Sequence, residues 1–166
     1  CSSDLLKKVK KIWGWISGMI LSVLILICMA FPAMKNDNSR LAMAEFFKEP
    51  SVVNFGEMMT VYHNIIRFSQ LALIIATILF LLFSIVVLLE HYSLLKMKLP
   101  MQLMTKIMSL VMLLSAVVSF VGCLLYLKNS SSQYHLRLGL ASILAMILTL
   151  ANSSIQWFAI KKTQPT

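Results

Sequence analysis

The stretch FSQLALIIATILFLLFSIVVLL, Phe68–Leu89, contains no Asp, Glu, Lys or Arg. A helix needs about 20 predominantly apolar residues to cross the hydrocarbon core of a bilayer. Within lipid, the backbone polar groups of a segment must be satisfied internally, which a helix achieves by itself. This stretch therefore predicts a membrane-spanning helix.

Three further stretches have the same character: residues 12–34, 107–127 and 138–160. The whole chain is 59% hydrophobic and 13% charged, whereas soluble proteins have about 45–50% apolar and about 25% charged residues. The four stretches leave no room for a separate soluble domain. The sequence predicts an all-α fold: one domain over residues 1–166, an integral membrane four-helix bundle in the lipid bilayer, with a larger outer loop at residues 35–67.

The basic residues predict the orientation of the bundle. The formal net charge is +9, and the cluster KKVKK at residues 7–11 immediately precedes the first span. Lys and Arg accumulate in cytoplasmic segments, and the first helix usually dominates the orientation. Both termini are therefore predicted to be cytoplasmic. Because the cations lie at the ends of spans rather than among stacking aromatics, we expect no nucleic acid as a partner.

Two segments of the outer loop carry local structural signals. NSRLAMAEFFKEP, residues 38–50, has the pattern of a short amphipathic helix that ends at Pro50. SVVNFG, residues 51–56, follows with strand-like residues before its glycine. We interpret the first segment as a helix on the membrane surface, with a partner-binding patch as the alternative.

Each predicted span carries small or polar residues at helical spacing. In the last span Thr149, Asn152, Ser153 and Gln156 follow an i, i+3, i+4, i+7 pattern and so lie on one helix face. The candidate helix-packing residues of the other spans are Gly14, Gly18, Ser22, Ala72, Ala76, Ser115, Ser119 and Gly122.

These faces are interpreted as the seams of the bundle. Helices in lipid associate through close backbone approach and interhelical hydrogen bonds, the latter worth about 0.6 kcal/mol on average. Replacing Asn152 or Gln156 by Leu should then cost about 1 kcal/mol of stability each. If the last span instead carries a ligand or ion site, the same changes should leave the protein folded.

No catalytic, cofactor-binding or metal-binding residues are predicted. The sequence has no GxSxG motif, no P-loop and no CxxC pair, and its three histidines are not spaced as metal ligands. The charge-free spans also lack the ionisable residue that marks ion and proton pathways. We therefore expect no enzymatic activity and no cofactor. Cys28 and Cys123 are read as free buried thiols, with a disulfide between them as the alternative.

Two short signals concern processing and location. Asn129-Ser130-Ser131 is a sequon, which makes Asn129 a candidate glycosylation site close to the membrane. The lysines of the C-terminal KKTQPT lie too far from the end for a di-lysine retrieval signal of the usual spacing. We expect the plasma membrane or another membrane of the secretory pathway as the location.

The four spans, the basic cluster at residues 7–11 and the segment NIIRFSQLAL, in which Arg67 opens the second span, resemble the claudin and peripheral-myelin-protein superfamily. The resemblance covers most of the chain as topology. It implies four helices and cytoplasmic termini; the disulfide and the strand-rich outer sheet of that superfamily are not carried over. The outer loop has neither Cys nor Trp, so the W-GLW-C-C signature is absent and no functional residue is carried over.

Three functions remain open at this point. The first is a non-enzymatic tetraspan that organises or adheres to other membrane proteins or to itself. The second is an accessory subunit of a channel or transporter. The third is a small transporter or lipid-modifying enzyme, which would need Asn152, Gln156 or Arg67 to line a cavity.

Overall fold

The computed structural model describes residues 2–35, 40–42, 52–92, 94, 100–129 and 137–159. Its helices are α1 (Ser2–Cys28), α2 (Val52–His91), α3 (Met101–Asn129) and α4 (Leu140–Ser154). A one-turn π-helix, η3 (Ile155–Ala159), continues α4. Three short strands, β1 (Pro32–Lys35), β2 (Arg40–Ala42) and β3 (Arg137–Leu138), complete the elements.

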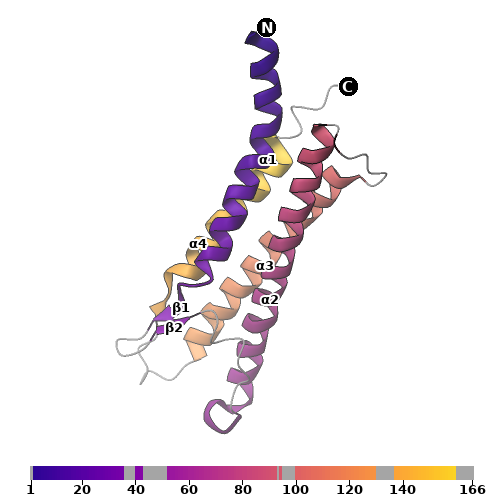
Figure 1. The fold of residues 1–166 in the computed structure, drawn as a ribbon. Coiled ribbons are helices and arrows are strands. Elements are labelled where there is room, and N and C mark those ends of the chain that lie inside the picture. The colour runs from indigo at the N-terminus through magenta and orange to yellow at the C-terminus, as the bar shows by residue number, and fades with distance from the viewer. Residues whose placement is uncertain are drawn as a thin grey trace.

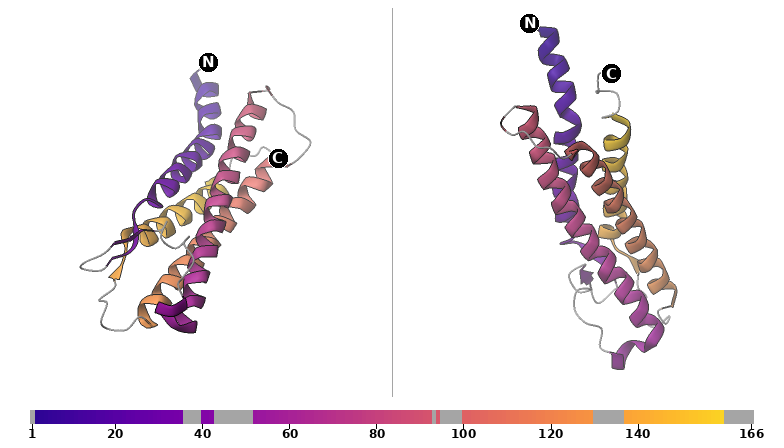
Figure 2. Two further views of the ribbon diagram at one scale, coloured as in Figure 1. Left: turned by 60° about the horizontal axis from the view of Figure 1, so that its bottom comes forward. Right: turned by 90° about the vertical axis from the view of Figure 1, so that its right-hand side faces the viewer.

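The helices form an antiparallel bundle in which each helix contacts two neighbours. Figure 1 shows α1 beside α4 and α2 beside α3, with the strands at one end of the bundle. α1 also contacts α2, and α3 contacts α4, which closes the ring. The second and third views agree with this arrangement (Figure 2). The end that carries the strands is called the sheet end below, and the end where α1 begins is called the terminal end.

The length and composition of the helices identify an integral, multi-pass membrane protein. Within the described residues, the helical segments Thr60–His91, Met101–Asn129 and Leu140–Phe158 are long and apolar enough to cross a bilayer. The apolar part of α1 is shorter and runs over Ile12–Cys28. The helical bundle predicted from the sequence is thus confirmed as the architecture.

The boundaries of the first two helices differ from the predicted spans. α1 ends at Cys28 rather than near residue 34, and Pro32 opens a strand. A residue before proline is disfavoured in helical conformation, which explains the early end. α2 begins at Val52, so the sheet-end part of α2 occupies much of the predicted loop 35–67.

Both local predictions for the outer loop are wrong where the structure describes it. The strand-like SVVNFG is helical from Val52 onward. Arg40–Ala42, at the start of the predicted amphipathic helix, forms strand β2 instead; the rest of that predicted helix lies outside the described residues. Tertiary pairing with β1 supplies hydrogen bonds that the local sequence pattern does not reveal.

The strands form one sheet in the order β2-β1-β3, with both pairs antiparallel. The register places Lys35 of β1 opposite Arg40 on one side and Arg137 on the other. Immediately after β3, the Gly139 amide donates a hydrogen bond to the Ala33 carbonyl oxygen at 2.7 Å. The sheet therefore links the segment that follows α1 to the segment that precedes α4.

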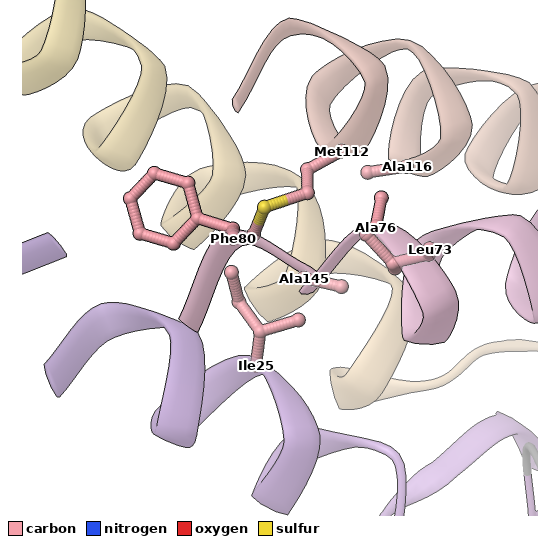
Figure 3. Packing of buried hydrophobic residues seen from close by; sticks show 7 residues of the cluster. All are labelled: Ile25, Leu73, Ala76, Phe80, Met112, Ala116 and Ala145. Atoms are coloured by element: carbon pink, nitrogen blue, oxygen red, sulfur yellow. The ribbon is translucent and has the colours of Figure 1, made fainter. Parts of the chain in front are cut away.

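The core of the bundle follows a heptad-like spacing. Buried residues of α2 recur at alternating steps of four and three: Ile66, Gln70, Leu73, Thr77, Phe80, Ser84 and Val87. Steps of this kind place knobs into holes between helices that cross at a small angle. Figure 3 shows the central layer, in which Ile25, Leu73, Ala76, Phe80, Met112, Ala116 and Ala145 pack together.

Candidate functional site

Most of the predicted helix-packing residues lie on the inward faces of the helices. The buried ones are Gly18, Ser22, Ala76, Ser115, Ser119, Gly122, Thr149, Asn152, Ser153 and Gln156. Gly14 is half-buried. On α4 the steps Ser142, Ala145, Thr149, Asn152 and Gln156 repeat the spacing of three and four found on α2.

Ala72 is the exception, and its assignment to a packing face is wrong. Its side chain is exposed, whereas Leu73 and Ala76 on the same helix are buried. Ala72 falls between the heptad positions of α2, so it faces away from the bundle. Its small size suggested a seam, but the phase of the repeat decides which residues face inward.

Gly18 allows the closest approach in the terminal half of the bundle. A Cβ atom at this position would lie 2.6 Å from Gln156 Nε2 and 3.1 Å from both Asn152 Oδ1 and Phe80 Cζ. The absence of a side chain at Gly18 therefore leaves the space that the amides of Asn152 and Gln156 occupy. Gln156 Nε2 also donates a long hydrogen bond of 3.4 Å to the Gly14 carbonyl oxygen.

The buried hydroxyls in the spans bond mainly to their own helices. Ser22 Oγ donates to the Gly18 carbonyl oxygen at 2.9 Å, and Thr149 Oγ1 donates to the Ala145 carbonyl oxygen at 2.8 Å. Thr77 Oγ1 makes the same kind of bond to Leu73 at 2.6 Å. Such bonds satisfy the donor locally. These hydroxyls therefore act as small packing groups.

Several buried amides and hydroxyls have unpartnered atoms. Asn152 Nδ2 reaches only Met112 Sδ, at 3.9 Å. The buried side-chain atoms without a hydrogen-bond partner are Gln70 Nε2 and Oε1, Ser84 Oγ, Ser119 Oγ, Asn152 Oδ1 and Gln156 Oε1. An unpartnered buried polar atom carries a desolvation cost of about 1–3 kcal/mol. The seams are thus polar but only partly bonded.

Sequence analysis missed several of the buried polar residues. Gln70, Thr77, Ser84, Thr105 and Ser109 are all 0% exposed. The heptad phase would have found Gln70, Thr77 and Ser84, because all three fall on the same repeat as Ile66. Packing faces were assigned in the sequence only from ridges of small residues and from the polar face of the last span.

Gly122 brings α3 against α2 near the sheet end. A Cβ atom there would lie 2.9 Å from Ile66 Cγ1 and 3.8 Å from the Ile66 backbone nitrogen. At the next residue, Cys123 Sγ lies 3.7 Å from Ser142 Oγ. Ser142 Oγ in turn donates to the Ala33 carbonyl oxygen at 3.3 Å. Cys28 and Cys123 are both free and buried, as the sequence led us to expect.

Asn129 is the last residue of α3 and is exposed. Its Nδ2, the atom that would carry a glycan, donates to the Leu125 carbonyl oxygen at 2.8 Å. This bond uses one of the two Nδ2 hydrogens and leaves the other for a glycan. Asn129 remains a candidate acceptor.

A groove of about 550 Å³ opens on the lipid-facing side of the α2–α3 hairpin. From α2 it is lined by Val61, Asn64, Ile65, Phe68 and Ser69, and from α3 by Leu114, Ser115 and Val118. Asn152, Gln156 and Arg67 do not line this groove. Within the part of the chain that the structure describes, no group of three or more His, Cys, Asp or Glu residues is placed to hold a metal.

Comparisons with known proteins give no relative: no family model matches the chain, and no curated protein and no solved structure is similar to it.

Proposed function

We propose that this multi-pass membrane protein is a non-enzymatic tetraspan that associates with other integral membrane proteins or with itself. It would act either as a claudin-like organiser or as an accessory subunit of a channel or transporter. The plasma membrane or another membrane of the secretory pathway is the proposed location, with both termini in the cytoplasm.

One observation carries this proposal: the side-chain amides of α4 and η3 lie inside the bundle. Asn152 of α4 and Gln156 of η3 are fully buried against Gly18. The lipid-facing positions of α4, such as Ile143, Ile147 and Leu150, are large and apolar. A bundle built in this way offers its exterior to other membrane components and keeps its polar residues for its own assembly.

The resemblance to claudin-like proteins concerns the topology of the spans. The sheet of β1, β2 and β3 at one end of the bundle was not expected from it, because the outer loop lacks the Cys and Trp signature of that superfamily. The absence of loop cysteines removes the disulfide of that superfamily. Pairing of β1 with β3 joins the two loop segments without it.

The alternative is a small transporter or a lipid-modifying enzyme. It requires Asn152, Gln156 or Arg67 to face a cavity that a substrate can enter. The first two are 0% exposed, and none of the three lines the groove on α2 and α3. The geometry therefore favours the associating tetraspan over this alternative.

A pull-down in mild detergent, followed by mass spectrometry, tests the proposal. The full chain, tagged at one terminus, is compared with an unrelated four-span protein expressed at the same level. We expect one or a few integral membrane proteins, or a second tagged copy of this chain, to be enriched specifically. Recovery of the chain alone, together with substrate uptake or lipid turnover by the purified protein, would support the transporter or enzyme instead.

A further inference from the structure

The groove on the α2–α3 hairpin is a lipid-facing hollow with a polar group near one end. α2 and α3 are antiparallel, and Gly122 lies against Ile66. Val118 is therefore level with residue 70 of α2, and Leu114 with residue 74. A rise of 1.5 Å per residue from Val61 to residue 74 of α2 gives the groove a length of about 20 Å.

Asn64 lies at the membrane-surface end of this groove. Its neighbours in the sequence, His63 and Arg67, mark the polar start of the span, and the charge-free stretch begins at Phe68. Asn64 is half-buried and lines the groove. An amphiphile in the groove would therefore place its polar group at Asn64 and its apolar body toward the bilayer centre.

The walls of the groove are apolar and stiff. Val61, Ile65 and Val118 are β-branched, and such side chains have few alternative conformations. Phe68, 64% exposed, adds a flat aromatic wall. The floor carries Ser69 and Ser115, which are buried and small. Small residues below a bulky rim produce an open groove on the helix surface.

The absence of charged residues in the groove lining favours an uncharged lipid over a phospholipid. None of the lining residues is ionisable. A phospholipid phosphate would call for Lys or Arg, which pair with phosphate through charge-assisted hydrogen bonds. The neutral amide of Asn64 instead suits an uncharged hydroxyl as donor or acceptor.

The rim argues against a helix of another protein as the occupant. Helices in membranes associate where small residues allow their backbones to approach. Here the exposed rim consists of Val61, Phe68, Leu114 and Val118, which would hold a second backbone away from the floor. The volume of about 550 Å³ lies in the range of small-molecule sites, about 300–1,000 Å³.

We propose that this groove binds a sterol from the leaflet on the side of the sheet. The sterol hydroxyl would lie at the Asn64 amide, and the rigid ring system would lie between Phe68 and Val118. This site is separate from the buried seams and does not depend on the associating role proposed above.

Photolabelling of the purified full chain tests the proposal. The protein is reconstituted in nanodiscs of phosphatidylcholine with a photoreactive cholesterol probe, and labelled residues are mapped by mass spectrometry. We expect saturable labelling on Val61–Ser69 or Leu114–Val118, competed by cholesterol and more weakly by its 3-epimer. Non-saturable labelling, or labelling spread evenly over the lipid-facing helices, would overturn the proposal.

Two matched variants on α3 localise the site. Val118→Trp places a large ring in the groove, whereas Leu110→Trp places the same ring on the same helix outside it; both residues are exposed. We expect Val118→Trp to weaken sterol binding about tenfold, or about 1.4 kcal/mol, and Leu110→Trp to bind as wild type. Equal labelling of the two variants contradicts the proposal.

Asn64→Leu provides a second arm in case Val118→Trp does not fold. This change keeps the groove apolar and removes the partner of the hydroxyl, so it should abolish the preference for cholesterol over its 3-epimer. An unchanged preference would refute the assigned orientation. Stronger labelling of the groove by a photoreactive phospholipid that cholesterol does not displace, or a cross-linked second protein there, would replace the sterol with another occupant.

Discussion

At the scale of single residues, Gly18 decides how closely α1 and α4 approach. Gly18→Ala adds a methyl group within 3.1 Å of three side-chain atoms from α2 and α4. Overpacking a close contact usually costs about 1–3 kcal/mol, and Ala in place of Gly inside a helix returns about 0.5–1 kcal/mol. Because the nearest atom, Gln156 Nε2, ends a flexible side chain, we expect a net loss of about 1 kcal/mol of stability. Thermal unfolding in detergent measures the loss. Ile20→Val, an exposed position on the same helix, is the control and should melt as wild type; an unchanged melting temperature for Gly18→Ala would contradict the close seam.

Asn152 and Gln156 should respond differently to replacement by Leu. Gln156 Nε2 bonds across to the Gly14 carbonyl oxygen on α1, whereas Asn152 Nδ2 reaches only a methionine sulfur atom; the side-chain oxygens of both residues are unpartnered. Gln156→Leu should therefore cost up to about 1 kcal/mol, because it removes the bond to α1, and Asn152→Leu should be nearly neutral, because it removes no bond to an oxygen or nitrogen atom. This revises the equal losses expected from the sequence.

The melting temperatures of the two variants, measured side by side in one detergent, test whether their stability losses differ. A loss for Asn152→Leu as large as that for Gln156→Leu would show that the Asn152 amide is fully bonded in the membrane. Raised melting of both variants would favour a ligand site on α4 over a seam.

At the scale of elements, Gly139 lies between β3 and α4 and packs its backbone directly against β1. A Cβ atom here would collide with the Pro32 carbonyl oxygen and lie 2.6 Å from the Ala33 carbonyl carbon. Because these are backbone atoms, they cannot move aside as a side chain would. Gly139→Ala should therefore destabilise the sheet end by about 1–3 kcal/mol or more.

Thiol labelling reports this loosening locally. Cys123 is 0% exposed and lies beside Ser142, which bonds to Ala33. We expect a small membrane-permeant maleimide to modify Cys123 faster in Gly139→Ala than in wild type, as mapped on the Cys123 peptide. Leu140→Ala, at an exposed neighbouring position, should label at the wild-type rate. Equal rates of Cys123 labelling in the two variants would show that Gly139 does not hold the sheet end together.

At the scale of the whole molecule, the orientation of the bundle can be tested directly. The start of α1 and the π-helix η3 both lie at the terminal end of the bundle (Figure 1). The basic cluster before the first span predicts that this end faces the cytoplasm. Epitope tags at both termini should be protected from protease and antibody in intact cells and become accessible after permeabilisation. Surface exposure of either tag would reverse the orientation.

The sequence was sufficient for the bundle and insufficient for its details, for physical reasons. Charge-free stretches such as Phe68–Leu89 report burial in lipid, so the helices could be predicted. The choice of inward face depends on the phase of the heptad, which is why Ala72 was misplaced and Gln70 was missed. Strands of two to four residues owe their existence to pairing between distant segments, as in β1 with β3. The groove depends on rim and floor residues from two helices, which no local pattern brings together.

Because α1 is synthesised before α4, the partner of the Gly18 surface leaves the ribosome last. α2 and α3 follow each other directly and can pair as a hairpin while synthesis continues. Until α4 is inserted, Gly18 lacks its neighbours from α4 and η3, and other helices can approach this small residue. A chain that stops before residue 140 would keep that surface open. Quality control in the membrane of synthesis therefore has a defined feature by which to distinguish an unfinished chain from a completed one.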